Sequence, residues 1–403
     1  MELGPILRAM LRNKLGVVLI GLQIAFTMTV MVNAIYIINE RSRLMARPSG
    51  LDEPNTFYLT SVGYGDSFNE ERQVERDLQL LRGLPGVVAA TFTNAIPVST
   101  SGSSTGVSAR PGDTESFIAT AQYRVDEHAL EALDLELVAG RNFVATDVRN
   151  RLSSDNSVNG QVIITLALAE QLFPDDPLSA VNNTMYVARQ SPTTIIGIVD
   201  RLQTPWPDSD FLEQSTLIPE NAIDSATTYL IRTEPGQRDR LMAEVENLLA
   251  DSGDPRIIRN LRSLEETRAE TYRVDSVMAT ILTYVISILV FITAMGIVGL
   301  AVFGINRRRK QIGTRRALGA TQGDVLRYFL LENLLITGMG VVLGAVLTIG
   351  FNVFLVQSFN LPRIQWYYPP LGMLVLLVVG QLSVLGPANR ASRIPPALAT
   401  RSV

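Results

Sequence analysis

The chain has 403 residues, 47% of them hydrophobic, and its mean hydropathy of +0.20 is high for a soluble protein. It contains no cysteine and one histidine, His128, which excludes disulfide bonds, thiol chemistry and a histidine-rich metal cluster. The net charge of −4 hides an asymmetry: residues 40–275 hold 36 of the 39 acidic and 21 of the 35 basic residues and carry −15, while the rest carries +11.

The first 14 residues are predicted to form a cytoplasmic amphipathic helix on the inner membrane surface. Their apolar residues recur at the spacing of one helical face, and their basic residues lie off that face. The apolar set is Leu3, Ile6, Leu7, Met10 and Leu11, and the basic set is Arg8, Arg12 and Lys14.

Four stretches without a charged residue predict membrane spans, because a transmembrane helix needs about 20 apolar residues. These stretches are Leu15–Asn39, Ser276–Asn306, Asn333–Pro362 and Ile364–Asn389. Within them we predict transmembrane helices over residues 15–39, 276–306, 333–357 and 368–389. A cleaved signal peptide is the alternative for the first. Val32-Asn33-Ala34 loosely resembles a cleavage site, but it lies deep in a run longer than an apolar signal core of about 7–15 residues.

Basic residues near the span ends predict the orientation in the membrane. They gather before the first span, in residues 307–332 and in residues 390–403, so these segments and both termini are predicted to be cytoplasmic. Arg363 in the outer turn is the exception, and Trp366, Tyr367 and Tyr368 beside it are typical of an outer aromatic belt. Residues 40–275 are then outside the cytoplasm.

The exterior segment is predicted to be mixed α/β with two subdomains. Strands at 57–63 and 87–98 flank an amphipathic helix at 69–87, and the strand–helix order recurs after Ser225. We therefore predict one subdomain from residues 50–100 and 225–260, a linker at Ser99–Ser108, and an inserted β-rich subdomain over 109–216. The predicted strands of the insert are 120–125, 135–140, 161–167, 184–188 and 193–199, with one short helix at 166–173.

Candidate metal or catalytic residues are few in this segment. Asp113 with Glu115, and Asp175 with Asp176, are acid pairs in turn-like sequence, which are more often solvated than calcium ligands. His128 has no evident partner. We expect no enzyme activity, metal or cofactor in this chain.

Two stretches without glycine or proline predict helices that continue beyond the membrane. They run from Leu22 to Arg47 and from Arg256 to Met295. The second could form a helix of about 60 Å, twice the hydrocarbon thickness. Residues 262–275 are predicted to form a helical stalk, and a loop is the alternative.

The densest basic cluster lies between the second and third spans. Residues 305–318 are predicted to form a short helix, Gly319 to form a left-handed C-cap, and Thr321 with Asp324 to form a capping box for the next helix. In the third span, Gly340 and Gly344 form a G-x-x-x-G pattern, with Thr348 on the same face, which predicts close packing against another helix.

With these features, the chain resembles the permease subunits of MacB/FtsX-type ABC transporters, also called type VII or mechanotransmission transporters. The basic loop and its continuation, residues 308–335, are RRKQIGTRRALGATQGDVLRYFLLENLL. They are similar to that family's loop, in which Ile-Gly-x-Arg-Arg-Ala-x-Gly-Ala follows a basic residue and a Glu or Gln. The order of one span, an exterior domain and three spans is also the same, and residues 123–143, 166–181 and 391–401 are more loosely similar.

The resemblance implies a multi-pass protein of the bacterial inner membrane whose periplasmic domain has a porter-like and a β-rich subdomain. It also implies a coupling helix that docks on a cytoplasmic ABC ATPase dimer, which would bind ATP and Mg²⁺, and a second permease, either this chain or a paralogue. No G-x-x-x-x-G-K-[ST] motif occurs, so ATP hydrolysis is expected in a separate chain. The implied coupling residues are Arg307, Arg308, Arg309, Lys310, Ile312, Gly313, Arg315, Arg316, Leu318 and Gly319.

Two functions fit this class of protein, and nothing in the sequence indicates nucleic-acid binding. In the first, the periplasmic domains export a peptide, toxin, antibiotic or lipid-like substrate, with or without a periplasmic adaptor and outer-membrane channel. In the second, an FtsX-like permease switches a cell-wall hydrolase or a sensor. An ion-driven transporter would carry ionisable groups within its spans, and the four predicted spans carry none.

The predicted topology can be tested by cysteine labelling, because the chain has no native cysteine. A single cysteine introduced near position 150 is expected to react with a membrane-impermeant reagent added from outside. A cysteine in the basic loop is expected to react only after the membrane is opened. Reaction of the first site exclusively from the cytoplasm would contradict the topology.

Overall fold

The computed structural model describes residues 14–65, 68–113, 117–152, 159–188, 191–223, 225–253, 255–359 and 363–395. The chain divides into two compact units. We call them the helical unit (Met1–Met45 and Val274–Val403) and the α/β unit (Ala46–Arg273). Apart from Lys14, the predicted amphipathic helix over residues 1–14 lies outside the described residues.

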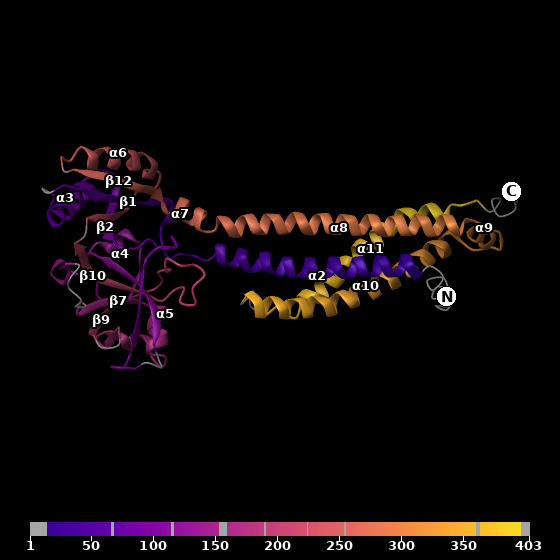
Figure 1. Ribbon diagram of the computed structural model, residues 1–403, viewed down its shortest axis with the longest axis horizontal. Helices are drawn as coiled ribbons and strands as arrows, with labels where there is room; N and C mark the ends of the chain where they lie inside the picture. Colours follow the sequence, from indigo (N-terminus) through magenta and orange to yellow (C-terminus); the bar gives the residue numbers. More distant parts are fainter. Residues whose placement is uncertain are drawn as a thin grey trace. The chain divides into compact units, whose positions relative to one another are not determined.

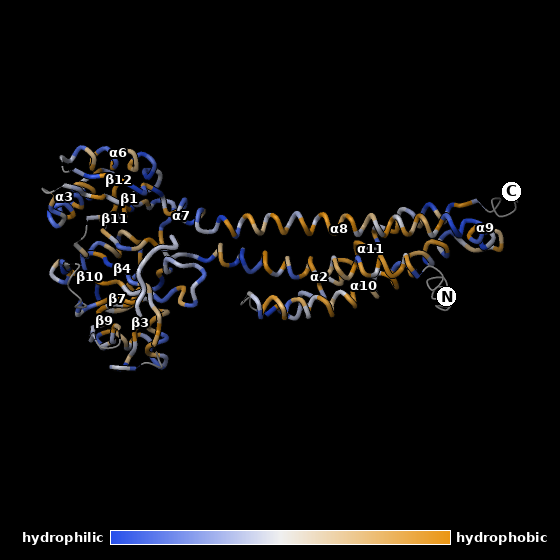
Figure 2. The backbone as a smooth tube through the Cα atoms, in the orientation of Figure 1, coloured by the Kyte–Doolittle hydropathy of each residue, from blue (hydrophilic) through white to orange (hydrophobic). Residues whose placement is uncertain are grey.

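Four helices of the helical unit are long and apolar enough to cross a membrane. They are α2 (Lys14–Met45), α8 (Arg273–Arg307), α10 (Gln322–Phe359) and α11 (Tyr368–Ser392), and the short helix α9 (Arg309–Ala317) joins α8 to α10 (Figure 1). Continuous helices satisfy their own peptide groups, which hydrocarbon requires. Figure 2 shows the contrast between the apolar helix α8 and the hydrophilic helix α9.

Helix α10 packs closely against α2 on one side and α11 on the other. A Cβ atom on Gly340 would lie 2.8 Å from the Cβ of Ile24, and one on Gly344 would lie 2.8 Å from the Cβ of Met28. Only glycine therefore permits this approach. On the other side of α10, the side-chain amide of Asn333 donates to the Gly380 carbonyl of α11 over 2.9 Å.

Helix α8 contacts these helices through fewer buried side chains. Its buried residues are Thr293, Ile297 and Ile305, while most of its large apolar side chains are exposed. The Thr293 hydroxyl lies 2.8 Å from the hydroxyl of Thr27 on α2, and one of the two donates to the other.

The α/β unit contains a four-stranded antiparallel sheet in the order β12-β1-β11-β2. Helices α3 and α6 cover one face of it, where Leu78 and Leu241 share a core with Phe57 and Tyr229. The elements are β1 (Thr56–Gly63), α3 (Glu70–Arg82), β2 (Val87–Thr93), β11 (Ala226–Thr233), α6 (Arg238–Ala250) and β12 (Arg256–Ser263). This is the split β-α-β arrangement, made from both ends of the segment.

The second sheet has eight strands and closes on itself. Strands follow the order β4-β3-β8-β9-β7-β10, and β10 also pairs with β4, while β5 and β6 are attached to β9 and β10. The strands are β3 (Ser103–Ser108), β4 (Ile118–Val125), β5 (Leu137–Gly140), β6 (Arg149–Leu152), β7 (Gln161–Thr165), β8 (Thr184–Val187), β9 (Ser191–Val199) and β10 (Ser215–Ile223). Helices α4 (Ala129–Ala132), α5 (Leu166–Leu172) and α7 (Leu264–Thr271) complete the unit, with short 3₁₀ turns at Glu53–Asn55, Ala145–Asp147 and Pro177–Ala180. A common core that includes Tyr58, Leu230, Tyr123 and Ile163 joins the two sheets.

Two local predictions were wrong, and strands β6 and β10 were not predicted. The uninterrupted helix that could have begun at Arg256 is instead strand β12, helix α7 and helix α8. Ile258 and Leu261 pack into the core beside β1, and Ser263 starts α7 with a capping box. The stalk predicted over residues 262–275 is helical from Leu264, apart from Tyr272. The predicted linker Ser99–Ser108 contains strand β3, in which Val107 is fully buried. Strand β10 was missed because it contains Pro219, Glu220 and Asn221, which are residue types that strands disfavour.

A buried ion pair crosses the core of the first sheet. The Arg256 guanidinium lies 2.6 Å from the Asp77 carboxylate, and the two side chains are 1% and 0% exposed. The Tyr229 hydroxyl also donates to Asp77 over 2.9 Å. Burial raises the pKa of Asp77 above its ordinary value, and the bonds from Arg256 and Tyr229 act in the opposite direction.

Asp77→Ala is expected to destabilise the α/β unit by about 3–5 kcal/mol, because it leaves the Arg256 charge buried without its carboxylate. Urea unfolding followed by tryptophan fluorescence measures this. Asp239→Ala is the control: its carboxylate pairs with Arg238 2.9 Å away but is 85% exposed, so about 0–1 kcal/mol is expected. Equal effects of the two substitutions would contradict the assigned role of the buried pair.

Gly344→Leu is expected to force α10 away from α2, because a Cβ there would also lie 3.1 Å from the Cα and carbonyl oxygen of Ala25. Overpacking of this kind costs about 1–3 kcal/mol or more. The matched control is Gly350→Leu on the same helix, where a Cβ meets no atom within 4 Å. Thermal stability and monodispersity in detergent should fall for the first variant only, and equal behaviour would rule out a packing role for Gly344.

Candidate functional site

The basic segment between α8 and α10 is a helix with a defined start and end. Arg308, at φ −106° and ψ 11°, interrupts the helix between α8 and α9. At the other end, Gly319 has φ 97°, the Ala320 N–H donates to the Arg315 carbonyl over 3.0 Å, and the Gly319 N–H donates to the Arg316 carbonyl over 3.2 Å. These two bonds form a Schellman motif, so the predicted left-handed C-cap is confirmed.

The next helix starts with the predicted capping box. The Asp324 N–H donates to the Thr321 hydroxyl over 3.1 Å, and the Asp324 carboxylate accepts from the Thr321 N–H over 3.0 Å. Two of the N–H groups that lack a partner within the helix at this end are therefore satisfied within the turn. Hydrogen bonds therefore fix both ends of the turn from α9 to α10.

One face of α9 is buried against the ends of α10 and α11. Ile312 is 6% exposed and belongs to a cluster with Val325, Phe329, Ala388 and Ile394. Gly313 beside it is also buried. Ile312, one of the implied coupling residues, therefore fixes α9 to its own chain.

The basic residues of the segment divide into two groups. Arg308 forms an ion pair with Glu332 of α10 at 2.9 Å, and Arg316 donates to the Ala320 carbonyl at 3.0 Å. Arg315 is exposed and lies with its guanidinium 5.2 Å from the centre of the Tyr328 ring. Arg308, one of the implied coupling residues, is thus paired within its own chain.

Besides Arg315, the segment exposes three basic side chains near the start of α9 and one large apolar side chain after its end. Arg307, Arg309 and Lys310 are exposed at the junction of α8 and α9. Leu318, at the end of α9 beside Gly319, is 83% exposed. We call Arg307, Arg309, Lys310 and Leu318 the basic face.

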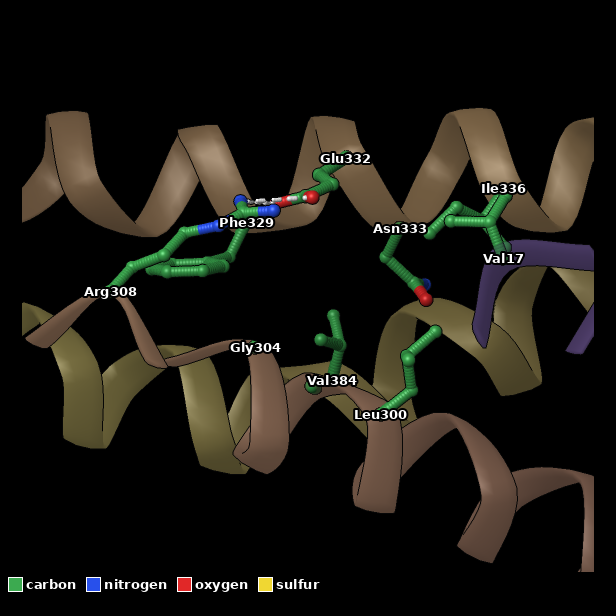
Figure 3. A pocket seen from close by; sticks show the side chains of 10 residues that line it. Val17, Leu300, Gly304, Arg308, Phe329, Glu332, Asn333, Ile336 and Val384 are labelled. Atoms are coloured by element: carbon green, nitrogen blue, oxygen red, sulfur yellow. Dashed lines mark hydrogen bonds and ion pairs between the residues drawn. The ribbon is translucent and has the colours of Figure 1, made fainter. Parts of the chain in front are cut away.

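A cavity of about 50 Å³ lies behind the ion pair, between α8 and the other helices. Figure 3 shows Arg308 reaching to Glu332 beside the ring of Phe329, with Asn333 pointing between the helices. The apolar lining consists of Val17, Leu300, Ala301, Gly304, Phe329, Ile336 and Val384.

The other candidate residues do not form a second site. Among the residues that the structure describes, no group of three or more His, Asp or Glu side chains could hold a metal ion. Asp175 and Asp176 are exposed at a 3₁₀ turn, and Glu115 lies outside the described residues. His128 lies at the start of α4, with its Nε2 3.7 Å from the Glu127 carboxylate.

Comparison with known families identifies both parts of the chain. Residues 15–248 match the MacB-like periplasmic core domain, and residues 283–396 match the FtsX-like permease C-terminal domain. A membrane permease with an extracytoplasmic α/β domain is the class of protein that these matches and the fold define. The first match covers more than half of the chain, and the protein belongs to the MacB/FtsX-type ABC transporter permeases. The resemblance found in the sequence is thus confirmed.

Its relatives are permeases of this type. The uncharacterized ABC transporter permease YknZ of Bacillus subtilis is 24% identical over 340 residues, which is 82% of this chain and 80% of YknZ. The macrolide export ATP-binding/permease protein MacB of Campylobacter jejuni is 23% identical over 291 residues, which is 68% of this chain and 42% of MacB. The crystal structure of the extracellular domain of YknZ aligns with 51% of this chain and all of that domain, at 16% identity and a TM-score of 0.32.

Proposed function

We propose that this permease couples a separate cytoplasmic ABC ATPase to the movement of its extracytoplasmic domain, and that the basic face is where the ATPase docks. The observation that carries this proposal is the exposure of Leu318, at 83%, on a turn that is fixed by a Schellman motif and a capping box. A large apolar side chain held rigidly in water is typical of a contact residue. The MacB relatives are named ATP-binding/permease proteins, which supports an ATPase as the partner.

The chemistry of the basic face specifies its partner. Three exposed cations, Arg307, Arg309 and Lys310, fit an acidic rim, and Leu318 fits an apolar pocket within it. ATP and Mg²⁺ would be bound by the partner, whose closure around ATP would pull on α9.

Two features support a relay of that movement to the exterior. At the cytoplasmic end, Ile312 buries α9 against α10 and α11. At the other end, α7 is bound firmly within the α/β unit: Arg268 pairs with Glu53 at 2.5 Å, and the Thr271 hydroxyl donates to the Val98 carbonyl over 2.7 Å. Only Tyr272 separates α7 from α8, so α8 links the basic segment to the α/β unit directly.

The wider assembly follows from the same proposal. The protein would be a multi-pass protein of the bacterial inner membrane that pairs with a second permease, with its α/β unit in the periplasm. Export of a peptide, toxin, antibiotic or lipid-like substrate is the function we favour, since the exterior segment holds two subdomains that could bind or push a substrate. A periplasmic adaptor and an outer-membrane channel would be further partners.

Leu318→Ser is expected to weaken ATPase association at least about tenfold, because loss of an apolar anchor typically costs 2 kcal/mol or more. Gly319→Leu should have a similar effect, since leucine is strained at a positive φ. Copurification of an ABC ATPase with the tagged chain from its native membrane, quantified by mass spectrometry, measures this.

The control is Leu178→Ser, the same substitution at a 49% exposed position of the α/β unit. It should leave association unchanged. Ile312→Ser is a second comparison, because it acts on a buried residue and should lower the stability of the segment itself. Wild-type association of the Leu318 and Gly319 variants would refute docking at the basic face.

A further inference from the structure

The ion pair between Arg308 and Glu332 lies where the chain turns from α8 into α9. One terminal nitrogen of Arg308 lies 3.0 Å and 2.9 Å from the two carboxylate oxygens of Glu332, and it donates to the Tyr328 hydroxyl over 3.4 Å. The two side chains are 21% and 14% exposed, so the pair is partly shielded from water. Charge-assisted hydrogen bonds in such settings are stronger than those at an open surface.

The distribution of acidic residues makes this pair distinctive. After Asp275 the chain contains two acids, Asp324 and Glu332. Asp324 closes the capping box of α10. Of these two acids, Glu332 is therefore the one left for the arginines around α9, and it binds the arginine at which the helix is interrupted.

The surroundings of the pair differ on its two sides. Toward α10, α9 is held by the burial of Ile312 and by Arg315 over the Tyr328 ring. Toward α8, a cavity of about 50 Å³ borders Leu300 and Gly304 (Figure 3). Ile305 in the last turn of α8 nevertheless shares the apolar cluster of Ile312 and Phe329. Helix α9 is thus attached to α10 by several contacts, and a small cavity borders the last turns of α8.

We propose that Arg308 and Glu332 form a positioning pair: the ion pair holds α9 at a fixed angle to α10, so that α8 bends relative to both at Arg308. The residues touch no ligand themselves. They act by orienting the basic face, to which we propose that the ATPase docks. The biological consequence of this inference therefore rests on the proposed function. The angle between α9 and α10 is formed within this chain, so it can be measured without the ATPase.

The test measures that angle in the full-length chain, reconstituted in lipid nanodiscs without any ATPase. Spin labels are attached to cysteines at Gln311 on α9 and Arg327 on α10, both exposed, and the chain has no other cysteine. Double electron–electron resonance then gives the distribution of distances between them. Arg308→Glu and Glu332→Arg are each expected to broaden it by roughly twofold or more, because each places two like charges in contact.

The exchanged variant, Arg308→Glu with Glu332→Arg, is expected to restore the narrow distribution. Arg390→Glu, the same change of charge at an exposed residue near the end of α11, is the control and should leave the distribution unchanged. Unchanged distributions in both single variants would overturn the positioning role. Broadening that the exchange does not reverse would also overturn it, since the angle would then depend on something other than this pair.

The outcome is independent of the docking experiment. If α9 does not bind an ATPase, the Leu318 and Gly319 variants will associate normally while the distance distributions still respond to the pair. If the pair does not position α9, the distributions will be indifferent to charge reversal while the Leu318 variant still loses its partner.

Discussion

The close contact of α2 with α10 is the interaction on which the helical unit depends. Lipid gives apolar helices no hydrophobic reason to associate, so they are held by close packing and by polar contacts between them. Gly340 and Gly344 bring the backbones together, and the Asn33 amide donates to the Thr348 carbonyl over 3.4 Å beside them. On the opposite side of α10, Gly380 of α11 permits a similarly close approach, because a Cβ there would lie 2.9 Å from the Thr337 hydroxyl. The three helices α2, α10 and α11 therefore provide a firm support for anything attached to α10.

The basic segment uses that support. Its residues were predicted to contact a partner together, yet the structure separates those that hold α9 in place from those that are exposed. Arg308 and Ile312 belong to the first group, and Arg309, Lys310 and Leu318 belong to the second. A signal for membrane orientation alone needs only positive charge, whereas this segment also has a Schellman motif, a capping box and an exposed leucine. The fixed conformation of the segment, together with its exposed leucine, is what favours a docking function.

The α/β unit is stabilised in a different way, by a shared core and a buried ion pair. Its two sheets share one core, and the pair of Asp77 with Arg256 lies within the first sheet's own core. A lone charge at that depth would be costly, and the pair is tolerated because Tyr229 and Arg256 both bond to the carboxylate. Helix α7 is tied to this unit at several points and leads directly into α8.

The sequence by itself determined the four membrane helices, the exterior α/β segment, the family and the caps at Gly319 and Thr321. These depend on local quantities: the length of uncharged runs, the distribution of arginine, and residues whose backbone preferences act over three or four positions. The sequence did not reveal strands β3, β10 and β12, because strand pairing joins residues far apart and tolerates Pro219 or a serine-rich stretch when the neighbouring strand supplies the pairing. Nor did it distinguish Ile312 from Leu318, or Arg308 from Arg309. Only the tertiary structure decided that, because whether a side chain on a short helix faces its own chain or a partner depends on which neighbouring helix lies against it.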